Sequence, residues 1–339
     1  MKNRYYTGPA SDHFDGTRFF NPNQATTDRS FGELLRWQLA GGKAAWPKEV
    51  AVTPATPEAR VEQLRITMVG HATLLIQVSG LNLLTDPLWS DRASPVRFAG
   101  PKRVTAPGIA FEALPPIDAV LLSHNHYDHL DIATLRRLQA VHQPLLVAPL
   151  GNDAIVRQSV PDMRIAAGDW GGRVTLGEGA YSDLVPAIHW SARGLGDRRM
   201  ALWAGHMIRT TRGQVWFAGD TAYGDGATFT GIRRDFGAPD VALIPIGAYE
   251  PRWFMAAQHA NPAEAVQIHR DVGAKRSLGI HWGTFQLTDE PREAPLVGLG
   301  EARAAAGLET QAFVAAAPGQ VFDFEAWGDR AARLVQLGG

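Results

Sequence analysis

The residues best suited to chemistry are gathered in one short run, Ser123-His124-Asn125-His126-Tyr127-Asp128-His129-Leu130-Asp131. Imidazole and carboxylate groups are the ligands that zinc accepts when no thiolate is available, and the chain has no cysteine. One metal cannot easily use all four ligand-type side chains at this spacing, whereas two neighbouring metals can. The run therefore predicts a metal centre, with a polar, His-rich loop as the alternative.

A buried strand is expected directly before this run, because residues 117–122 are a short apolar stretch. Open α/β sheets place their sites at the carboxyl ends of strands. His124 and His126 are two residues apart, so in extended backbone their side chains point to one side. Asp128 and His129 are adjacent and need a turn to converge.

Further candidate ligands each follow an apolar, strand-like run, at residues 184–188, 215–219 and 277–280. This repeated placement favours two neighbouring metals. A carboxylate has two oxygens to share, so the aspartate among the candidates is expected to bridge them. The expected ligands are His124, His126 and His189 for one metal and Asp128, His129 and His281 for the other, with Asp220 as the bridge.

Two more residues, His71 and Asp86, close strands that should lie beside the metal run. Asp86 can accept the free ring N–H of a ligating histidine, or it can form an Asx turn before Pro87. His71 is either close to the site or structural. The remaining histidines without ligand context are expected at the surface or in the core: His13, His142, His206 and His269.

Composition limits the class of protein. The chain has 339 residues, a formal net charge of −1 and a hydrophobic fraction of 45%, which is ordinary for a globular protein. The sequence has no stripe of basic residues of the kind that binds nucleic acid, so no nucleic-acid partner is expected. The N-terminus lacks an apolar segment behind its basic start, and no apolar run is long enough to cross a bilayer. We expect a cytoplasmic protein, with peripheral contact to the inner membrane face as an alternative.

Two regions are expected, an N-terminal arm with one helix over residues 1–60 and a hydrolase-type domain over 61–339. Ser30 and Glu33 form a capping box for a helix over 30–40. Its apolar residues are too many for one narrow stripe, so it either packs on the core or lies at a lipid interface. From residue 64, strands and helices alternate, which indicates the α/β class.

The pattern His-x-His-x-Asp-His resembles the metal motif of the metallo-β-lactamase superfamily. A narrower resemblance, over roughly residues 64–290, is to the N-acyl-phosphatidylethanolamine-hydrolysing phospholipase D family. It rests on Gly70-His71-Ala72-Thr73, Leu84-Thr85-Asp86-Pro87, Ser90-Asp91-Arg92-Ala93-Ser94-Pro95, Gly100-Pro101-Lys102-Arg103, Phe217-Ala218-Gly219-Asp220-Thr221, Ile244-Pro245-Ile246-Gly247-Ala248-Tyr249-Glu250-Pro251-Arg252-Trp253-Phe254-Met255 and Ile280-His281-Trp282-Gly283-Thr284-Phe285.

The resemblance implies an αββα sandwich with two zinc ions per chain and a phospholipid substrate. A homodimer is one form of assembly to be expected. Iron or manganese can replace zinc at such ligands. The implied reaction is hydrolysis of the phosphodiester to phosphatidic acid and N-acylethanolamine. Gln258 and His259 match the family's phosphate-proximal pair, and Tyr249 and Arg252 belong to the matching substrate-side run.

Three side chains have expected catalytic roles. Asp220 would fix the spacing of the metals, Asp128 would align the attacking water, and His259 would donate a hydrogen bond or proton to the leaving oxygen. Gln258 and His259 can instead belong to a loop without substrate contact. The alternative activity is hydrolysis of a soluble phosphodiester or a lactone on the same fold, and the alternative without catalysis is a metal-bound scaffold.

Overall fold

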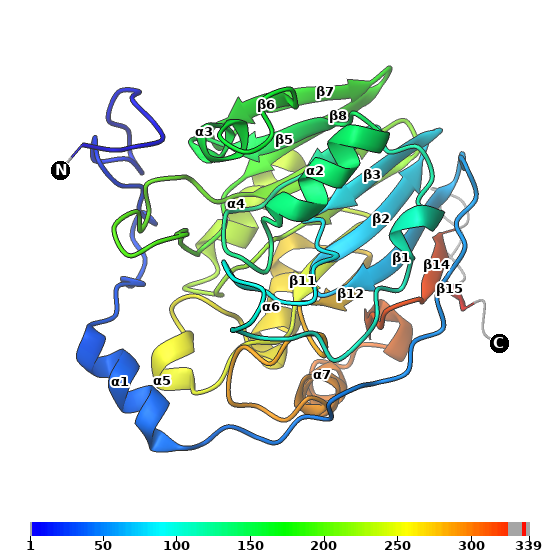
Figure 1. Ribbon diagram of the computed structural model, residues 1–339. Coiled ribbons are helices and arrows are strands. Elements are labelled where there is room, and N and C mark those ends of the chain that lie inside the picture. Colours follow the sequence, from blue (N-terminus) through cyan, green and yellow to red (C-terminus); the bar gives the residue numbers. More distant parts are fainter. Residues whose placement is uncertain (1, 325–333, 337–339) are drawn as a thin grey trace.

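The computed structural model describes residues 2–324 and 334–336 (Figure 1). They form two mixed β-sheets that face each other, with helices on the outer face of each. One sheet has the strand order β15-β14-β1-β2-β3-β4-β5-β6 and the other β13-β12-β11-β10-β9-β8-β7. The predicted αββα sandwich is confirmed.

The first sheet contains β1 (Leu64–Gly70), β2 (Thr73–Val78), β3 (Leu81–Thr85), β4 (Ala119–Leu121), β5 (Leu145–Pro149), β6 (Arg164–Gly168), β14 (Val321–Phe324) and β15 (Leu334–Gln336). The second contains β7 (Arg173–Gly177), β8 (Ala180–Val185), β9 (Gly205–Thr210), β10 (Gly213–Phe217), β11 (Val241–Pro245), β12 (Arg276–Ile280) and β13 (Phe313–Ala315). The helices are α1 (Phe31–Ala40), α2 (Ile132–Val141), α3 (Asn152–Arg157), α4 (Ala227–Phe236), α5 (Arg252–Met255), α6 (Pro262–Val272) and α7 (Ala294–Ala305), with 3₁₀ turns at Phe111–Ala113 and Thr310–Ala312.

Three apolar layers hold the sandwich together. Between the sheets, buried side chains such as Ile66, Ile76 and Phe217 form one cluster. A second cluster joins the first sheet to α2 and α3, and a third joins the second sheet to α4, α6 and α7. Burial of apolar area is the main favourable term in folding, so these layers fix the two sheets relative to each other.

The strand directions bring several carboxyl ends to one edge. β1 and β3 each pair antiparallel with β2, and β4 pairs parallel with β3, so β1, β3 and β4 share a direction. In the other sheet, β8 and β10 each pair antiparallel with β9, and β10, β11 and β12 are parallel. His71, Asp86, the metal run, His189, Asp220 and His281 all follow strands of these two sets.

Two of the apolar runs extend beyond their strands. β8 ends at Val185 and β10 ends at Phe217, so His189 and Asp220 are carried by short loops rather than by the strand ends themselves. Pro186 has no N–H to continue a sheet ladder. Gly219 has a φ of 64°, a left-handed conformation that glycine adopts without strain. These residues end the strands earlier than hydrophobicity alone indicates.

Helix α1 begins and ends where the sequence predicts. Ser30 caps it through a complete capping box with Glu33, and Gly41 ends it in the left-handed conformation. Among the side chains of α1 that the structure describes, only that of Trp37 is buried, and it packs in a small cluster with Phe254 and Met255 of α5. The helix therefore packs on α5 rather than on the main core.

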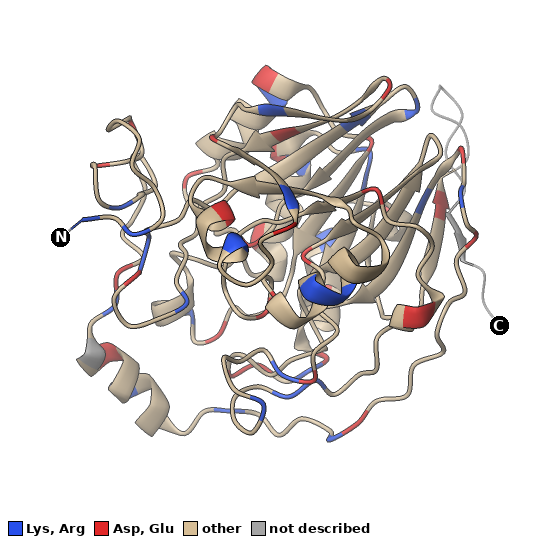
Figure 2. Cartoon of the chain, turned by 45° about the horizontal axis from the view of Figure 1, so that its top comes forward, with Lys and Arg blue, Asp and Glu red and all other residues tan. Residues whose placement is uncertain are grey.

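Basic and acidic residues are interspersed over both sheets and their helices (Figure 2), in keeping with the near-zero net charge. Within the described part of the chain, no helix has the length and apolar character needed to span a membrane.

Candidate metal centre

The predicted metal run forms a tight turn directly after β4. The backbone N–H groups of His129 and Leu130 both donate to the carbonyl of His126, at 3.1 and 2.8 Å. This turn brings Asp128 and His129 back toward His124, as their spacing requires. In the run from Ser123 to Asp131, the side chains of His126, Tyr127 and Asp128 are partly exposed, and the others are buried.

One set of three imidazoles meets at the amino side of the run. The Nε2 atom of His124 lies 2.9 Å from Nδ1 of His126, and Nε2 of His189 lies 3.3 Å from the same Nδ1. The three nitrogen atoms lie within 4.8 Å of one another. They are the three ligands predicted for the first metal.

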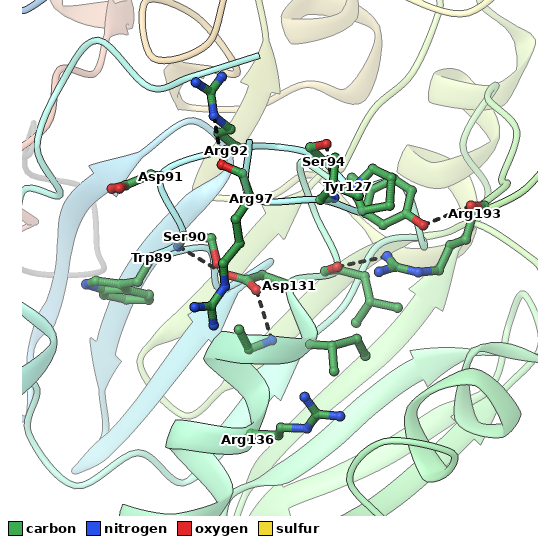
Figure 3. A pocket seen from close by; sticks show the side chains of 15 residues that line it. Trp89, Ser90, Asp91, Arg92, Ser94, Arg97, Tyr127, Asp131, Arg136 and Arg193 are labelled. Atoms are coloured by element: carbon green, nitrogen blue, oxygen red, sulfur yellow. Dashed lines mark hydrogen bonds between the residues drawn. The ribbon is translucent and has the colours of Figure 1, made fainter. Parts of the chain in front are cut away.

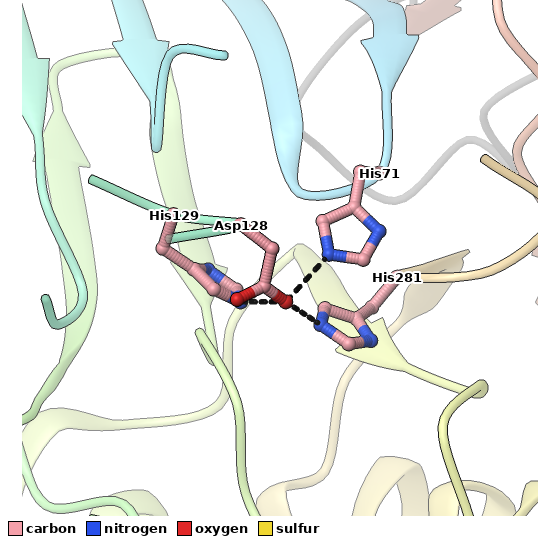
Figure 4. A group of neighbouring side chains, drawn as sticks. All are labelled: His71, Asp128, His129 and His281. Atoms are coloured by element: carbon pink, nitrogen blue, oxygen red, sulfur yellow. Dashed lines mark hydrogen bonds and ion pairs between the residues drawn. The ribbon is translucent and has the colours of Figure 1, made fainter. Parts of the chain in front are cut away.

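The second set surrounds the carboxylate of Asp128 (Figure 4). Its Oδ2 atom lies 3.4 Å from Nε2 of His129 and 3.3 Å from Nε2 of His281. Nε2 of His71 lies closer still, at 3.0 Å. The three ligands predicted for the second metal are therefore together, and His71 is a fourth member of the group.

Asp220 lies between the two sets. Its Oδ2 atom is 3.2 Å from Nε2 of His129, and its Oδ1 atom is 3.2 Å from Nε2 of His281. The same Oδ2 atom is 3.7 Å from Nε2 of His189 and 4.0 Å from Nε2 of His124. A carboxylate so placed can reach cations held by either set.

The donor chemistry fits a pair of cations. Nε2 of His129 is buried 3.2 Å from Oδ2 of Asp220 and 3.4 Å from Oδ2 of Asp128, yet it forms no aligned hydrogen bond with a described residue. A cation among these atoms would be coordinated by the ring and the carboxylates together. Two carboxylates and five imidazoles also form the oxygen and nitrogen set that zinc, iron and manganese accept.

Burial and mutual charge set the protonation of the cluster. Burial and the neighbouring imidazoles of His129 and His126 hold the pKa of His124 well below its usual value. Burial would also lower the pKa of His129, but the carboxylates of Asp220, Asp128 and Asp86 raise it well above that value. Burial raises the pKa of Asp220, yet His129 and His281 together hold it well below the usual range. The carboxylates therefore stay ionised, and a bound cation would take the place of the proton that His129 holds.

Asp86 supports the cluster from behind. Its Oδ2 atom accepts from Nδ1 of His129 at 2.6 Å and from the Ser123 hydroxyl at 2.5 Å. Its Oδ1 atom accepts from the Ser123 backbone N–H at 2.7 Å. The hydrogen bond from Nδ1 of His129 to Asp86 leaves Nε2 of the same ring facing Asp128 and Asp220. Of the two alternatives for Asp86, the structure shows the contact with a predicted ligand.

The loops that carry His71 and His281 are held in an uncommon backbone conformation. His71 has a φ of 57° and His281 a φ of 61°, values that non-glycine residues rarely adopt and that cost of order 1–3 kcal/mol. The His281 N–H donates to the His71 carbonyl at 2.8 Å, and the His71 N–H donates to the Thr284 hydroxyl at 3.0 Å. The chain bears this strain while placing both rings at Asp128.

The backbone carbonyl of Gln258 orients the ring of His189. Its carbonyl accepts from Nδ1 of His189 at 2.9 Å. Its side-chain amide is already engaged, since Oε1 accepts from the Trp190 indole at 2.5 Å and Nε2 donates to the Met255 sulfur at 3.1 Å. The structure thus shows the Gln258 carbonyl orienting a predicted ligand, while one N–H and one oxygen lone pair of its side-chain amide remain unused by these two contacts.

Arg252, predicted as a substrate contact, is committed elsewhere. Its guanidinium pairs with both oxygens of Glu264 at 2.9 and 2.8 Å and donates to the His259 carbonyl at 2.9 Å. Glu264 is the capping-box residue of α6, so Arg252 ties α5 to that helix. A contact between Arg252 and the substrate stays a prediction. The ion pair with Glu264 is a further contact that the linear sequence does not reveal.

Tyr249 lies half-buried in the loop after β11. Burial, with the carboxylates of Glu290 and Glu250, raises the pKa of its hydroxyl to about 12. Glu290 also accepts from the Ala248 N–H at 2.6 Å and the Glu250 N–H at 3.1 Å, which shapes this loop.

His259 stands beside both sets of predicted ligands. Its Nδ1 atom lies 3.9 Å from Oδ2 of Asp220, and its ring centroid is 5.1 Å from that of His189 and 5.6 Å from that of His281. Burial lowers its pKa to about 4, so the ring is neutral at pH 7 and keeps one N–H donor. The structure brings His259 to the centre, as the sequence predicted.

Two important supports escape the sequence analysis. The Ser123 hydroxyl lies 2.9 Å from Nδ1 of His124. Nη1 of Arg193 donates to the carbonyls of Asn125 and Leu130, at 3.0 and 2.9 Å, and so joins the two ends of the metal run. The position of Ser123 directly before His124 could have indicated its contact with that ring. Arg193 is far from the metal run in the sequence, and no motif indicates that it contacts the run.

The other histidines have structural contacts. Nε2 of His13 pairs with Asp169 at 2.7 Å. Nε2 of His206 donates to the Leu122 carbonyl at 2.8 Å, and Nδ1 of His269 lies 2.8 Å from the Ser277 hydroxyl. His142 ends α2. They lie in the core or at the surface, as expected.

Comparison with known proteins agrees with this geometry. Residues 81–282, more than half of the chain, match the model of the β-lactamase superfamily domain. A metallo hydrolase of the archaeon Ignicoccus hospitalis superposes with a TM-score of 0.58 at 20% identity, covering 78% of this chain and 100% of that one. Fold and site together define a metal-dependent hydrolase of this superfamily.

Two relatives narrow the class. An uncharacterized protein of Mycobacterium tuberculosis is 37% identical over 305 residues, covering 88% of this chain and 80% of its own. The N-acyl-phosphatidylethanolamine-hydrolyzing phospholipase D 1 of Caenorhabditis elegans is 38% identical over 275 residues, covering 76% of this chain and 75% of its own. The chain belongs to the family of N-acyl-phosphatidylethanolamine-hydrolysing phospholipases D within the β-lactamase superfamily.

The contact of Asp86 with His129 yields a test. Replacing the carboxylate in Asp86→Asn should weaken metal binding about 10- to 100-fold, because the ligand ring loses the charged acceptor that orients it. Competition with a chelator would measure the affinity, and circular dichroism would check the fold. Asp118→Asn, a half-buried aspartate outside the centre, serves as control. Unchanged metal affinity in a folded Asp86→Asn protein would contradict the supporting role.

Proposed function

We propose that the protein is a zinc-dependent phosphodiesterase of the phospholipase D type. Its proposed reaction splits N-acyl-phosphatidylethanolamine into phosphatidic acid and N-acylethanolamine. The observation that carries the proposal is Asp220, whose carboxylate lies between two three-residue ligand sets in a chain of this family. When bound there, a metal pair supplies Lewis acidity toward phosphoryl oxygens and activates water at neutral pH.

The residues of the chain then have distinct tasks. Asp220 sets the distance between the two ligand sets, because its two oxygens face His129 and His281 separately. Asp128 is held by three imidazole nitrogens and is only partly exposed. It can therefore accept a hydrogen bond from an attacking water without swinging away, which helps to hold that water in line.

His259 is suited to the leaving group. In the proposed step, a water oxygen bonds to phosphorus and gives up a proton, the bond between phosphorus and the ethanolamine oxygen breaks, and that oxygen takes up a proton. The water supplies this proton, and the neutral His259 ring, with its one N–H beside Asp220, can donate a hydrogen bond to the leaving oxygen. Its Nδ1 atom is buried and has no hydrogen-bond partner among the described residues, so it is free for this task.

The assay follows directly. Wild-type protein in mixed micelles should release N-acylethanolamine, identified by mass spectrometry, whereas His259→Ala should turn over about 100- to 10,000-fold more slowly. Its zinc content should equal that of wild type, since His259 is outside the two ligand sets. His142→Ala, at the end of α2, is the matched control.

Loss of zinc in His259→Ala would make this residue a ligand or a structural support instead. No release by a wild-type protein that retains its metal would move the substrate to soluble phosphodiesters or lactones.

A lipid substrate requires contact with a lipid surface, and α1 is suited to it. Leu34, Leu35 and Leu39 are 40%, 46% and 75% exposed. The exposed Trp253 of α5 is next to them, with the Arg36 guanidinium 5.0 Å from its ring centroid. We propose that these residues, the α1 patch, touch the bilayer beside the α5 segment that leads to His259.

This contact can be tested apart from catalysis. Leu35→Glu with Leu39→Glu should reduce co-sedimentation with phosphatidylcholine vesicles about tenfold or more, because each buried leucine contributes about 1.5–3 kcal/mol. Hydrolysis of a soluble phosphodiester should stay unchanged. Leu195→Glu, on a fully exposed leucine elsewhere, should bind vesicles normally. Full vesicle binding by the double variant would show that another surface makes the contact.

A further inference from the structure

A hollow lies beside the metal run, apart from the two ligand sets. It has a volume of about 550 Å³ and runs between the loop after β3 and the start of α2 (Figure 3). None of the predicted metal ligands lines it. We call it the arginine pocket, because its lining includes the four arginines Arg92, Arg97, Arg136 and Arg193. The aromatic residues Trp89 and Tyr127 also line it.

The charge of the arginine pocket is positive. Four arginines line it, against Asp91 and Asp131. Asp131 is turned inward as the N-cap of α2, where it accepts from the N–H groups of Ala133, Thr134 and Ser90. Its negative charge is therefore largely taken up by the helix start, and the surplus positive charge favours an anion.

Two of the guanidinium groups have unused donors. Arg97 reaches from the loop over the first turn of α2 (Figure 3), and its guanidinium makes no hydrogen bond or ion pair with any described residue, although its backbone carbonyl accepts from Nε of Arg92 at 3.1 Å. Arg136 uses only its Nε atom, which donates to the Ser159 carbonyl at 3.1 Å. Arginine carries five N–H donors in a planar fork that fits phosphate oxygens in pairs. The donors needed for a phosphate group are thus present.

The back wall of the pocket is part of the metal run itself. The Tyr127 hydroxyl donates to the Arg193 carbonyl at 2.9 Å, and the Arg193 guanidinium lies 4.0 Å from the Tyr127 ring centroid. The same guanidinium bridges the carbonyls of Asn125 and Leu130. A ligand in the pocket would therefore touch the residues that brace the metal run, without reaching the metals.

We propose that the arginine pocket binds a phosphomonoester group, either free phosphate or the head group of phosphatidic acid, at a site separate from the metal centre. The binding does not depend on the proposed function. If that function holds, the lipid product carries the same phosphomonoester and can occupy the pocket after leaving the metals.

The test uses the metal-loaded enzyme and calorimetric titration with inorganic phosphate. Arg97→Gln with Arg136→Gln should weaken the pocket component about tenfold or more, since it removes two charge-assisted contacts. Phosphate binding at the metals occurs in all variants and cancels in the comparison. Arg157→Gln, on an exposed arginine of α3, is the control, and hydrolytic activity should be unchanged in both proteins.

A second titration uses vesicles of phosphatidylcholine with and without phosphatidic acid. Arginine-dependent binding of inorganic phosphate would identify free phosphate as a sufficient ligand. Arginine-dependent binding only of the vesicles with phosphatidic acid would identify the lipid head group. Equal binding of both ligands by wild type and the double variant would overturn the proposal, and would leave the proposed hydrolysis untouched.

Discussion

The structure depends on one electrostatic constraint, the burial of Asp220 and Asp128 among five imidazoles. Ionised carboxylates are costly to bury unless they are paired, and these two lie 3.2–3.4 Å from the imidazole nitrogens of His129 and His281. Imidazoles this close repel one another if protonated. Cations between the rings and the carboxylates satisfy both groups at once. The cluster is thus arranged for metals rather than for its own stability.

The fold meets this constraint by joining two rigid sheets at one edge. Neither sheet carries a whole ligand set, since His124, His126 and Asp128 follow the first sheet and His189, Asp220 and His281 follow the second. The apolar layer between the sheets therefore fixes the distances between ligands. Around this edge, Asp86, the Gln258 carbonyl and Arg193 each hold one ligand or loop in place. Such outer contacts orient ligands and tune a metal.

Much of this could be predicted from the sequence. The ligand types, their spacing and their places after strands predicted which residues would meet, because strand direction decides which loops share an edge. The contacts of Arg252 and Gln258 could not be predicted. Arg252 meets Glu264 because α5 packs beside α6, and Gln258 meets Trp190 because one loop packs on another. The periodicity of apolar residues in the sequence does not reveal such packing. The early ends of β8 and β10 show how Pro186 and Gly219 override an apolar pattern.

Two metal ions should flank Asp220. Anomalous X-ray diffraction from crystals of the zinc-loaded protein would locate them, with the zinc content of the same sample determined by mass spectrometry. We predict two zinc ions per chain, about 3.5–4 Å apart. One should lie among His124, His126 and His189 and the other among Asp128, His129 and His281, with Asp220 between them. A single peak, or a pair that leaves Asp220 without a metal contact, would contradict the account.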